Sequence, residues 1–248
     1  MRVCLAASES LTKSNRSFFV ENCPYSLVSF FYIDKWQSAL FNSDLFLLDS
    51  GAFTFMNSCK GTVDFDSYLT KYIKFINKND IKYFFELDVD AIVGYPKVVE
   101  MRSKLERETG KQCIPVWHKS RGLNNWIELT KQYDYVAIGG FAIKDITERD
   151  YKYITELLNI AKKNNCKVHG LGFTNLKYIR ILHFYSVDST SWRSGSRFGT
   201  VYLFRNNTLK QIKPPKGKRL KSGEYLSEME LHNLVEWLKF QDYADKYL

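Results

Sequence analysis

Three aspartates follow short apolar segments of this chain and could take part in acid–base or nucleophilic chemistry. Asp49 ends the segment FLLD, Asp88 stands in FFELDVD, and Asp188 stands in YSVDSTSW. In a parallel α/β fold, the carboxyl ends of the strands hold catalytic groups on a rigid scaffold. Burying like charges together is costly unless a proton, a cation or a polar substrate compensates them. The three aspartates therefore predict a substrate site at the strand ends.

Two other interpretations of these carboxylates stay open. Asp188 could simply cap the helix that follows it, since Asp is common at helix starts. The acidic strand ends could also bind Mg²⁺, for which two or three carboxylates with water molecules suffice. Because strand side chains alternate, Glu86, Asp88 and Asp90 should share one face, and at least one of them should point toward the site.

Short apolar strands alternate with helical segments along most of the chain. The expected strands cover residues 2–6, 45–48, 81–87, 111–117, 135–138, 167–171, 184–187 and 200–204. The expected helices cover residues 65–77, 95–109, 123–133, 148–164, 175–183 and 227–247, and the last has a capping box in Ser227 and Glu230. Repeated βα units without a Rossmann fingerprint or a GxxxxGK[ST] loop predict an α/β fold of the (β/α)8, or TIM-barrel, type.

Composition predicts a globular domain. The chain has 248 residues, of which 45% are hydrophobic, so global disorder is excluded and a single barrel domain is expected. No apolar run approaches the roughly 20 residues of a membrane span. The first residues, MRVCLAASES, lack the features of a secretory signal. We therefore expect a cytoplasmic protein that does not bind membranes.

The cysteines do not form a recognisable metal-binding pattern. The five cysteines are Cys4, Cys23, Cys59, Cys113 and Cys166. They lie far apart, form no CxxC pair, and belong to no Cys/His cluster with the ligand spacing of zinc sites. We expect reduced thiols and no structural zinc or other metal.

The charge of the chain favours an anionic partner, and nucleic acid is the commonest one. The net charge is +9, and residues 205–221 contain seven cations and no acid. A segment of this composition predicts an extended loop that follows a phosphate backbone through Lys213, Lys216, Lys218 and Arg219. A solvated surface loop without a ligand is the alternative. We therefore divide the chain into a catalytic barrel over 1–204, a basic loop over 205–226 and a helix packed on the barrel over 227–248.

Five short motifs occur in a characteristic order along the chain. They are DSGAF, LDVD with Tyr95 and Pro96 soon after it, AIGG, HGLGF, and SVDSTSW followed by RFGT. From residue 45 to about residue 204, this order resembles the guanine transglycosylases, and most of all the phage and bacterial enzymes that place 7-deazaguanine bases in DNA. The tRNA-modifying members have a zinc site with clustered cysteines after the last motif, where this chain has its basic run. The resemblance thus implies a barrel without the zinc subdomain and DNA as the polymer.

The resemblance also implies a role for each aspartate in an exchange of guanine in DNA for a preQ0-type 7-deazaguanine. Asp188 is the nucleophile that attacks C1′ of the target nucleotide and forms a covalent glycosyl-enzyme intermediate. Asp49 deprotonates the incoming base, and Asp88 accepts hydrogen bonds from the donor edge of the purine. No cofactor is expected, because the covalent intermediate conserves the energy of the glycosidic bond.

Further residues are implied to hold the base. The backbone at Gly139 and Gly140 approaches the carbonyl oxygen of the base, and Phe53 stacks on its ring with His169 on the opposite side. His118 is the expected polar contact at the end of the fourth strand. The glycines, Phe53 and His169 also have purely structural alternatives: a plain βα turn for the glycines, a core position for Phe53, and an ordinary surface histidine at a strand end for His169.

Two arginines flank the loop after Asp188. Arg193 and Arg197, with Gly195 and Gly199 permitting close approach, suit the phosphates on either side of a flipped nucleotide. A duplex hides C1′, so an enzyme of this kind extrudes its target into the mouth of the barrel. Trp192 could insert into the gap, but we expect it to be a core residue.

Three other functions remain open from the sequence: the same exchange on tRNA, a non-catalytic nucleic-acid-binding paralogue, and a metal-dependent nuclease. Related enzymes form dimers, which makes a homodimer a candidate state of this chain. Phage origin would place the protein in the cytoplasm of the host.

Overall fold

The structure, a computed structural model, describes residues 1–51, 54, 63–173, 175–213 and 223–248. Its elements, in chain order, are β1 (Arg2–Ala6), η1 (Ser8–Ser10), η2 (Lys13–Asn15), α1 (Arg16–Asn22), β2 (Tyr25–Ser29), η3 (Phe30–Tyr32), η4 (Lys35–Leu40), β3 (Leu45–Asp49), α3 (Phe65–Lys78), β4 (Tyr83–Phe84), α4 (Asp90–Val93), α5 (Tyr95–Thr109), β5 (Val116–Trp117), η5 (Lys119–Arg121), α6 (Gly122–Gln132), β6 (Tyr135–Ile138), η6 (Glu148–Asp150), α7 (Tyr151–Lys163), β7 (Lys167–Gly170), β8 (Ser186–Ser189), η7 (Ser191–Arg193), α8 (Ser194–Phe198), β9 (Val201–Arg205), β10 (Thr208–Ile212) and α9 (Gly223–Tyr247).

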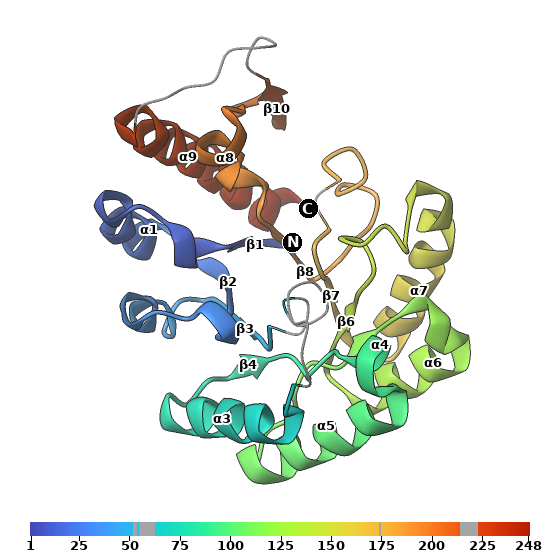
Figure 1. The fold of residues 1–248 in the computed structure, drawn as a ribbon. Coiled ribbons are helices and arrows are strands. Elements are labelled where there is room, and N and C mark those ends of the chain that lie inside the picture. Colours follow the sequence, from blue (N-terminus) through green and yellow to red (C-terminus); the bar gives the residue numbers. More distant parts are fainter. Residues whose placement is uncertain (52–53, 55–62, 174, 214–222) are drawn as a thin grey trace.

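A curled parallel sheet of eight strands forms the centre of the molecule, in the order β4-β3-β2-β1-β8-β7-β6-β5. The helices lie around its outer face (Figure 1). No continuous ladder joins the edge strands β4 and β5 within the described residues. A single parallel bridge pairs Phe85 with Ile114 there, and the amide of Ile114 donates to the carbonyl of Phe84 at 2.8 Å. The architecture is α/β and compatible with a TIM-barrel-like fold, although the barrel is not closed.

Alternating side chains of the strands fill two separate cores. One set packs against the surrounding helices, and the other fills the inside of the curl. The inner set is Cys4, Ala6, Tyr25, Leu27, Leu45, Leu47, Phe85, Ile114, Val116, Tyr135 and Ala137. Asp49 continues the inner row of β3 by the same alternation, and Asp188 lies opposite Cys4 in the β1–β8 pairing. The two carboxylates therefore reach the carboxyl-terminal edge of the sheet from inside the curl.

Helix α3 supports the strand that carries Asp49. Asp64 caps the helix by accepting a hydrogen bond from the amide of Ser67 at 3.0 Å. The hydroxyl of Tyr72 donates to the carbonyl of Leu48, and that of Tyr68 donates to the carbonyl of Ser50 at 2.7 Å. These hydrogen bonds fix the carboxyl-terminal end of β3 against helix α3. They thereby hold the backbone on either side of Asp49 in place.

The eighth strand of the sheet is not the one expected from the sequence. Residues 200–204 were predicted to complete the set, but Val201–Arg205 pairs antiparallel with Thr208–Ile212 in a separate hairpin. The missing strand is β2, Tyr25–Ser29, which lies between β1 and β3. Four of its five residues are buried. Both of its faces are therefore covered, and it lacks the apolar–polar alternation that would mark a half-buried strand.

The described part of the basic run is also more ordered than an extended loop. Asn206 and Asn207 have φ values of 51° and 61°, which suit the tight turn that joins β9 to β10.

The predicted helix over 175–183 is wrong. Consecutive turns replace it, with the amides of Tyr178 and Ile179 both donating to the carbonyl of Asn175.

Helix α9 begins at Gly223, so the predicted capping box at Ser227 and Glu230 is wrong. The buried carboxylate of Glu230 instead accepts hydrogen bonds from the amide of Thr12 at 3.0 Å and from the side chain of Asn15 at 2.9 Å. It also pairs with the guanidinium of Arg193. One carboxylate thus joins the loop after β1, the segment after β8 and the last helix.

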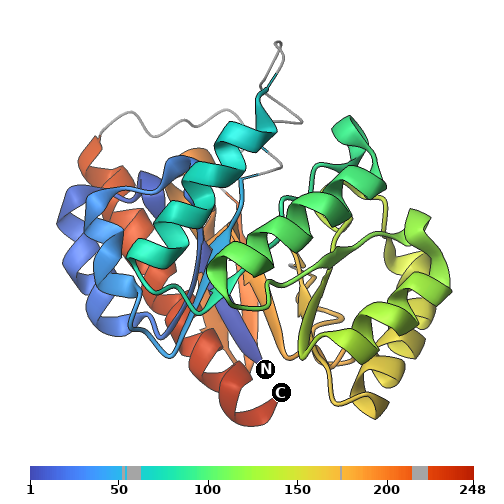
Figure 2. The same ribbon diagram turned by 90° about the horizontal axis from the view of Figure 1, so that it is seen from below.

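The two ends of the chain meet at the amino-terminal edge of the sheet. The amino group of Met1 donates to the carbonyl of Ala244 at 2.9 Å, and Figure 2 shows the termini side by side.

The described cysteines, Cys4, Cys23, Cys113 and Cys166, are buried free thiols, as expected, and Cys59 lies outside the described residues. None of the helices in the described ranges combines the length and apolarity needed to cross a bilayer.

We predict that Glu230→Ala destabilises the protein strongly, because it leaves the buried Arg193 guanidinium without its carboxylate. Breaking a buried ion pair from one side costs roughly 3–5 kcal/mol. Urea denaturation followed by circular dichroism measures the loss. Glu228→Ala, on the exposed face of the same helix, is the control and should change the free energy of unfolding by under about 0.5 kcal/mol. Equal stability of the two variants would contradict the prediction.

Candidate active site

A cavity of about 470 Å³ opens at the carboxyl-terminal edge of the sheet. Its lining includes six of the eight residues that the sequence singled out for catalysis or base binding: Asp49, Asp88, His118, Gly139, Gly140 and Asp188. They come from the ends of β3, β5, β6 and β8 and from the segment after β4. A cavity of this size and place is typical of a small-molecule site in a parallel α/β protein.

Asp188 is held by one oxygen and open at the other. Its Oδ1 accepts hydrogen bonds from the amide of Gly172 and from Nε2 of His169, which lies 3.2 Å away. Its Oδ2 has no hydrogen bond with any described residue. Asp188 does not cap the following helix, because Thr190 is the residue at that position. The geometry is that of a fixed carboxylate that presents a free oxygen to the cavity.

Asp49 has the properties of a proton carrier. Burial raises the pKa of Asp49 to about 6, and the charges of Asp188 and Asp88 act in the same direction, although a hydrogen bond from the amide of Gly51 opposes them. Gly51 has a φ of +84°, and a Cβ there would lie 2.6 Å from Cβ of Phe31. The glycine of the DSGAF motif is therefore needed to turn the chain under Asp49.

Asp88 lies between two basic side chains. Nε2 of His118 is 2.7 Å from Oδ2 of Asp88, and Nη2 of Arg121 is 3.3 Å from its Oδ1. Burial lowers the pKa of His118, but the hydrogen bond and charge of Asp88 outweigh it, so the pKa lies above its ordinary value. These two partners leave part of the hydrogen-bonding capacity of the Asp88 carboxyl group free.

Arg121 organises the acidic segment after β4. Its buried guanidinium lies 2.8 Å from Asp90, 3.3 Å from Asp88 and 3.5 Å from Glu86, and it stacks on the ring of Tyr95. Burial raises the pKa of Glu86 to about 7, against the opposing charges of Arg102 and Arg121. Glu86 and Asp88 both line the cavity, as expected. The strand alternation from which this was argued is wrong, because β4 ends at Phe84 and Asp90 begins α4.

Asp88, Asp90 and His118 are close enough to one another to hold a metal ion. The guanidinium of Arg121 already neutralises the two aspartates of this group at 2.8 and 3.3 Å. A divalent cation would have to bind beside that fixed positive charge. The arrangement therefore suits hydrogen bonding to a polar substrate better than metal coordination.

The glycine pair after β6 makes room for His118. A Cβ at Gly139 would lie 2.6 Å from Cε1 of His118, and Gly140 has a φ of +98°. Side chains at these positions would displace the imidazole or strain the turn. Both glycines line the cavity, so a bound molecule can approach the backbone directly.

His169 and Arg193 lie elsewhere than expected. His169 is fully buried beneath the cavity, where its Nδ1 contacts Ser186 and its Nε2 contacts Asp188, so it supports that carboxylate rather than stacking on a ligand. Arg193 is buried against Glu230 and the carbonyl of Ser10, which directs its guanidinium away from the surface. Trp192 is a core residue, as expected, and its Nε1 donates to the carbonyl of Ala6.

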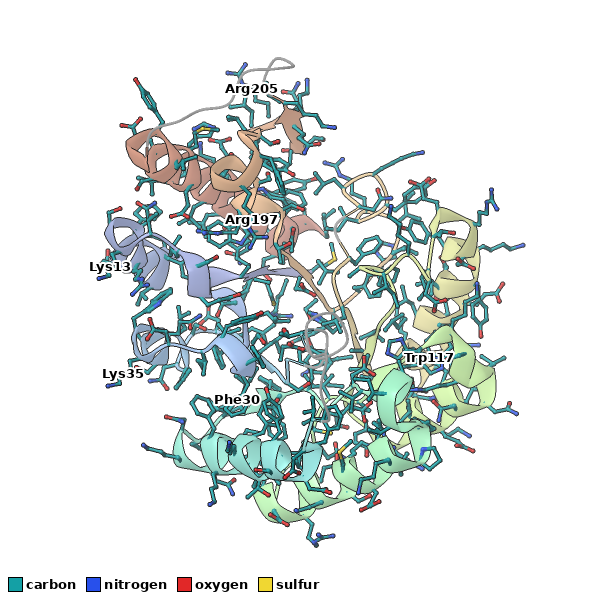
Figure 3. All side chains as sticks on the ribbon, in the orientation of Figure 1. Lys13, Phe30, Lys35, Trp117, Arg197 and Arg205 are labelled. Atoms are coloured by element: carbon teal, nitrogen blue, oxygen red, sulfur yellow. The ribbon has the colours of Figure 1, made fainter. Side chains whose placement is uncertain are left out.

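The remaining predicted residues lie outside this cavity or outside the described part of the chain. Arg197 and Lys213 line a neighbouring cavity, and Figure 3 places Arg197 between the hairpin and the central sheet. Phe53, Lys216, Lys218 and Arg219 lie outside the described residues.

Sequence reasoning did not single out Glu9 and Arg121, two charged residues of the site. Glu9 lines the cavity just after β1, burial raises its pKa, and its Oε2 is buried without a described hydrogen-bond partner. Glu86 and Arg121 complete the charged network. Glu9 also follows a strand end, which is the signal that could have identified it. Arg121 lies beyond the end of β5, and no sequence motif around it indicates a functional role.

No protein-family model matches this chain, and none of the curated proteins is significantly similar to it. Its function must therefore be inferred from the site itself.

We predict a pH-dependent stabilisation by Asp49→Asn. The pKa of Asp49 is about 6 in the fold and about 4 in an unfolded chain, so ionisation is harder in the folded state. The folded protein therefore loses stability relative to the variant as the pH rises from about 4 to 6. Above pH 6, the variant should be more stable by roughly 1–3 kcal/mol, and below pH 4 the two should be alike.

Urea denaturation at pH 4, 5, 6 and 7.5 measures this difference. Asp134→Asn, at the exposed amino end of β6, is the matched control and should behave as wild type throughout. If Asp49→Asn is more stable than wild type by the same amount at every pH, or less stable at pH 7.5, the prediction is contradicted. Ionisation of Asp49 would then not reduce the stability of the folded protein.

Proposed function

We propose that this protein is a DNA guanine transglycosylase with a single-domain (β/α)8-like barrel and no zinc subdomain. In this proposal it exchanges guanine in DNA for a 7-deazaguanine base. The observation that supports it most is the arrangement of Asp188, whose Oδ1 is anchored by Gly172 and His169 while Oδ2 is open to the cavity. Asp49, with a pKa of about 6, and Asp88 line the same cavity.

In the first step, Oδ2 of Asp188 attacks C1′ of the target deoxyguanosine, and the C1′–N9 bond breaks. The bonding electrons leave with guanine, which takes a proton from Asp49. The sugar remains attached to Asp188 as an ester-like glycosyl-enzyme intermediate. The amide of Gly172 and the imidazole of His169 hold the attacking carboxylate in one orientation, which lowers the entropic cost of the step.

In the second step, the ionised Asp49 removes the N9 proton of the incoming 7-deazaguanine. N9 then attacks C1′, and the bond to Asp188 breaks, which restores the carboxylate. One proton leaves Asp49 and one returns, so the enzyme ends in its starting state without an oxidant or reductant. A carboxyl group with a pKa of about 6 suits both transfers near neutral pH.

The network around Asp88 suits a guanine-type edge. The carboxyl group of Asp88 can accept from the N1–H and N2–H groups of the base, while His118 can donate to the neighbouring carbonyl oxygen. The backbone at Gly139 and Gly140 permits close approach on that side. Arg121 is a positioning residue in this scheme, since it acts on the base only through Asp88.

DNA is the polymer we favour, with tRNA as the alternative. The net charge of +9 and the cations Arg197 and Lys213 beside the site favour an anionic polymer. Because Asp188 lies inside the cavity, the target nucleotide must leave the duplex to reach it.

The decisive test is incorporation of a mass-distinct 7-deazaguanine into guanine-containing duplex DNA, with tRNA assayed in parallel. We expect incorporation into DNA by the wild type and a loss of at least about 1,000-fold in Asp188→Asn, because the amide cannot act as the nucleophile. The same substitution at Asp134, at the opposite edge of the sheet, should leave the rate unchanged.

Each other result would point to a different function. Preference for tRNA would overturn the choice of polymer. No incorporation into either polymer by folded wild-type protein would favour a binding paralogue. Strand cleavage that a chelator abolishes would favour a nuclease built on Asp88, Asp90 and His118.

A further inference from the structure

A second cavity, of about 550 Å³, adjoins the candidate active site. The two cavities share Thr190 and Ser191, which follow Asp188 within three residues. The second cavity runs from there along α8 toward the hairpin of β9 and β10. The two cavities are therefore immediate neighbours, separated by no more than these two residues.

The walls of the second cavity are fixed by helix α9. A Cβ at Gly195 would lie 2.7 Å from Nδ2 of Asn233, so this glycine lets α8 pack closely on α9. Asn233 also accepts from the amide of Tyr202 at 2.8 Å and donates to the carbonyl of Thr200 at 2.9 Å. The cavity is a formed feature of the fold, which reduces the entropic cost of binding in it.

The lining combines positive charge with an exposed aromatic ring. Arg197 and Lys213 are exposed, and neither forms an ion pair with another described residue. The Phe198 side chain is 72% exposed, more than any other large hydrophobic residue in the part of the chain that the structure describes. Oγ of Ser194 is buried without a described hydrogen-bond partner. Cations, a ring and an unused hydroxyl together suit an anionic ligand with a flat apolar part.

We propose that this cavity binds the nucleotide next to the extruded guanosine in the same DNA strand, with its base stacked on Phe198 and its phosphate between Arg197 and Lys213. The proposal rests on the proposed function. Base–aromatic stacking is tolerant of sequence, so the subsite would hold the unstacked neighbour without reading it. Its role would be to keep the strand open while the target is in the active site.

The test uses a guanine-containing duplex with 5-iodo-2′-deoxyuridine placed immediately 5′ or immediately 3′ of the target. Irradiation of the wild-type complex should crosslink one of these two positions to residues of α8 or β9. Phe198→Ala should remove the crosslink and weaken duplex binding roughly 5- to 100-fold, whereas Phe198→Tyr should retain both.

Tyr247→Ala is the matched control. Tyr247 is also aromatic and 62% exposed, but it lies at the end of α9, where Ala244 meets Met1 at the opposite edge of the sheet. Its loss should leave duplex binding unchanged. Binding of the free 7-deazaguanine, measured by calorimetry, should be the same in Phe198→Ala and wild type, because Phe198 does not line the active-site cavity.

Base exchange by the wild type on the same duplex separates this proposal from the one it rests on. A Phe198-dependent crosslink without base exchange would support the subsite and overturn the transglycosylase. Base exchange with equal duplex affinity in Phe198→Ala and Tyr247→Ala would overturn the subsite alone. Crosslinks from both positions to residues outside α8 and β9 would also overturn it.

Discussion

The structure depends on how it compensates several carboxylates buried at one edge of a parallel sheet. Asp188 is stabilised by an amide and an imidazole, and Asp88 by Arg121 and His118. Burial raises the pKa of Asp49 to about 6, and the charges of Asp188 and Asp88 add to this rise, while a hydrogen bond from the amide of Gly51 opposes it. Under the proposed function, the three environments suit three roles: a fixed nucleophile, a hydrogen-bond acceptor and a proton carrier. Similar carboxyl groups in different surroundings are a common way to run acid and base chemistry in one site.

The surrounding fold serves this arrangement through a few buried polar contacts. Tyr68 and Tyr72 of α3 fix the end of β3 beneath Asp49. Glu230 of α9 binds the loop after β1 and the segment after β8, so it holds two rims of the cavity at once. Much of the support thus comes from outside the sheet. Helix α9 does not follow a strand of the curled sheet, yet it holds segments next to the candidate active site and packs against α8 beside the second cavity.

The sequence predicted those helices and strands whose hydrophobic pattern matches the way they are buried in the fold. The helix over 95–109 and the strands over 2–6 and 135–138 have the predicted bounds. Strand Tyr25–Ser29 was missed because it is buried on both faces, and 200–204 was misplaced because an apolar strand does not specify its partner. The site aspartates were found from their position at strand ends. The roles of Arg121 and Arg193 depend on carboxylates 31 to 37 positions away, and no local pattern reveals these pairs.

The most direct test of the central claim is to isolate the covalent intermediate on Asp188. Wild-type protein is incubated with a short guanine-containing duplex without an incoming base, denatured, and analysed by mass spectrometry and peptide mapping. The mechanism predicts a protein–DNA adduct that has lost one guanine and is attached at Asp188, and no adduct in Asp188→Asn. Base exchange without any adduct, or an adduct that persists in Asp188→Asn, would contradict the mechanism.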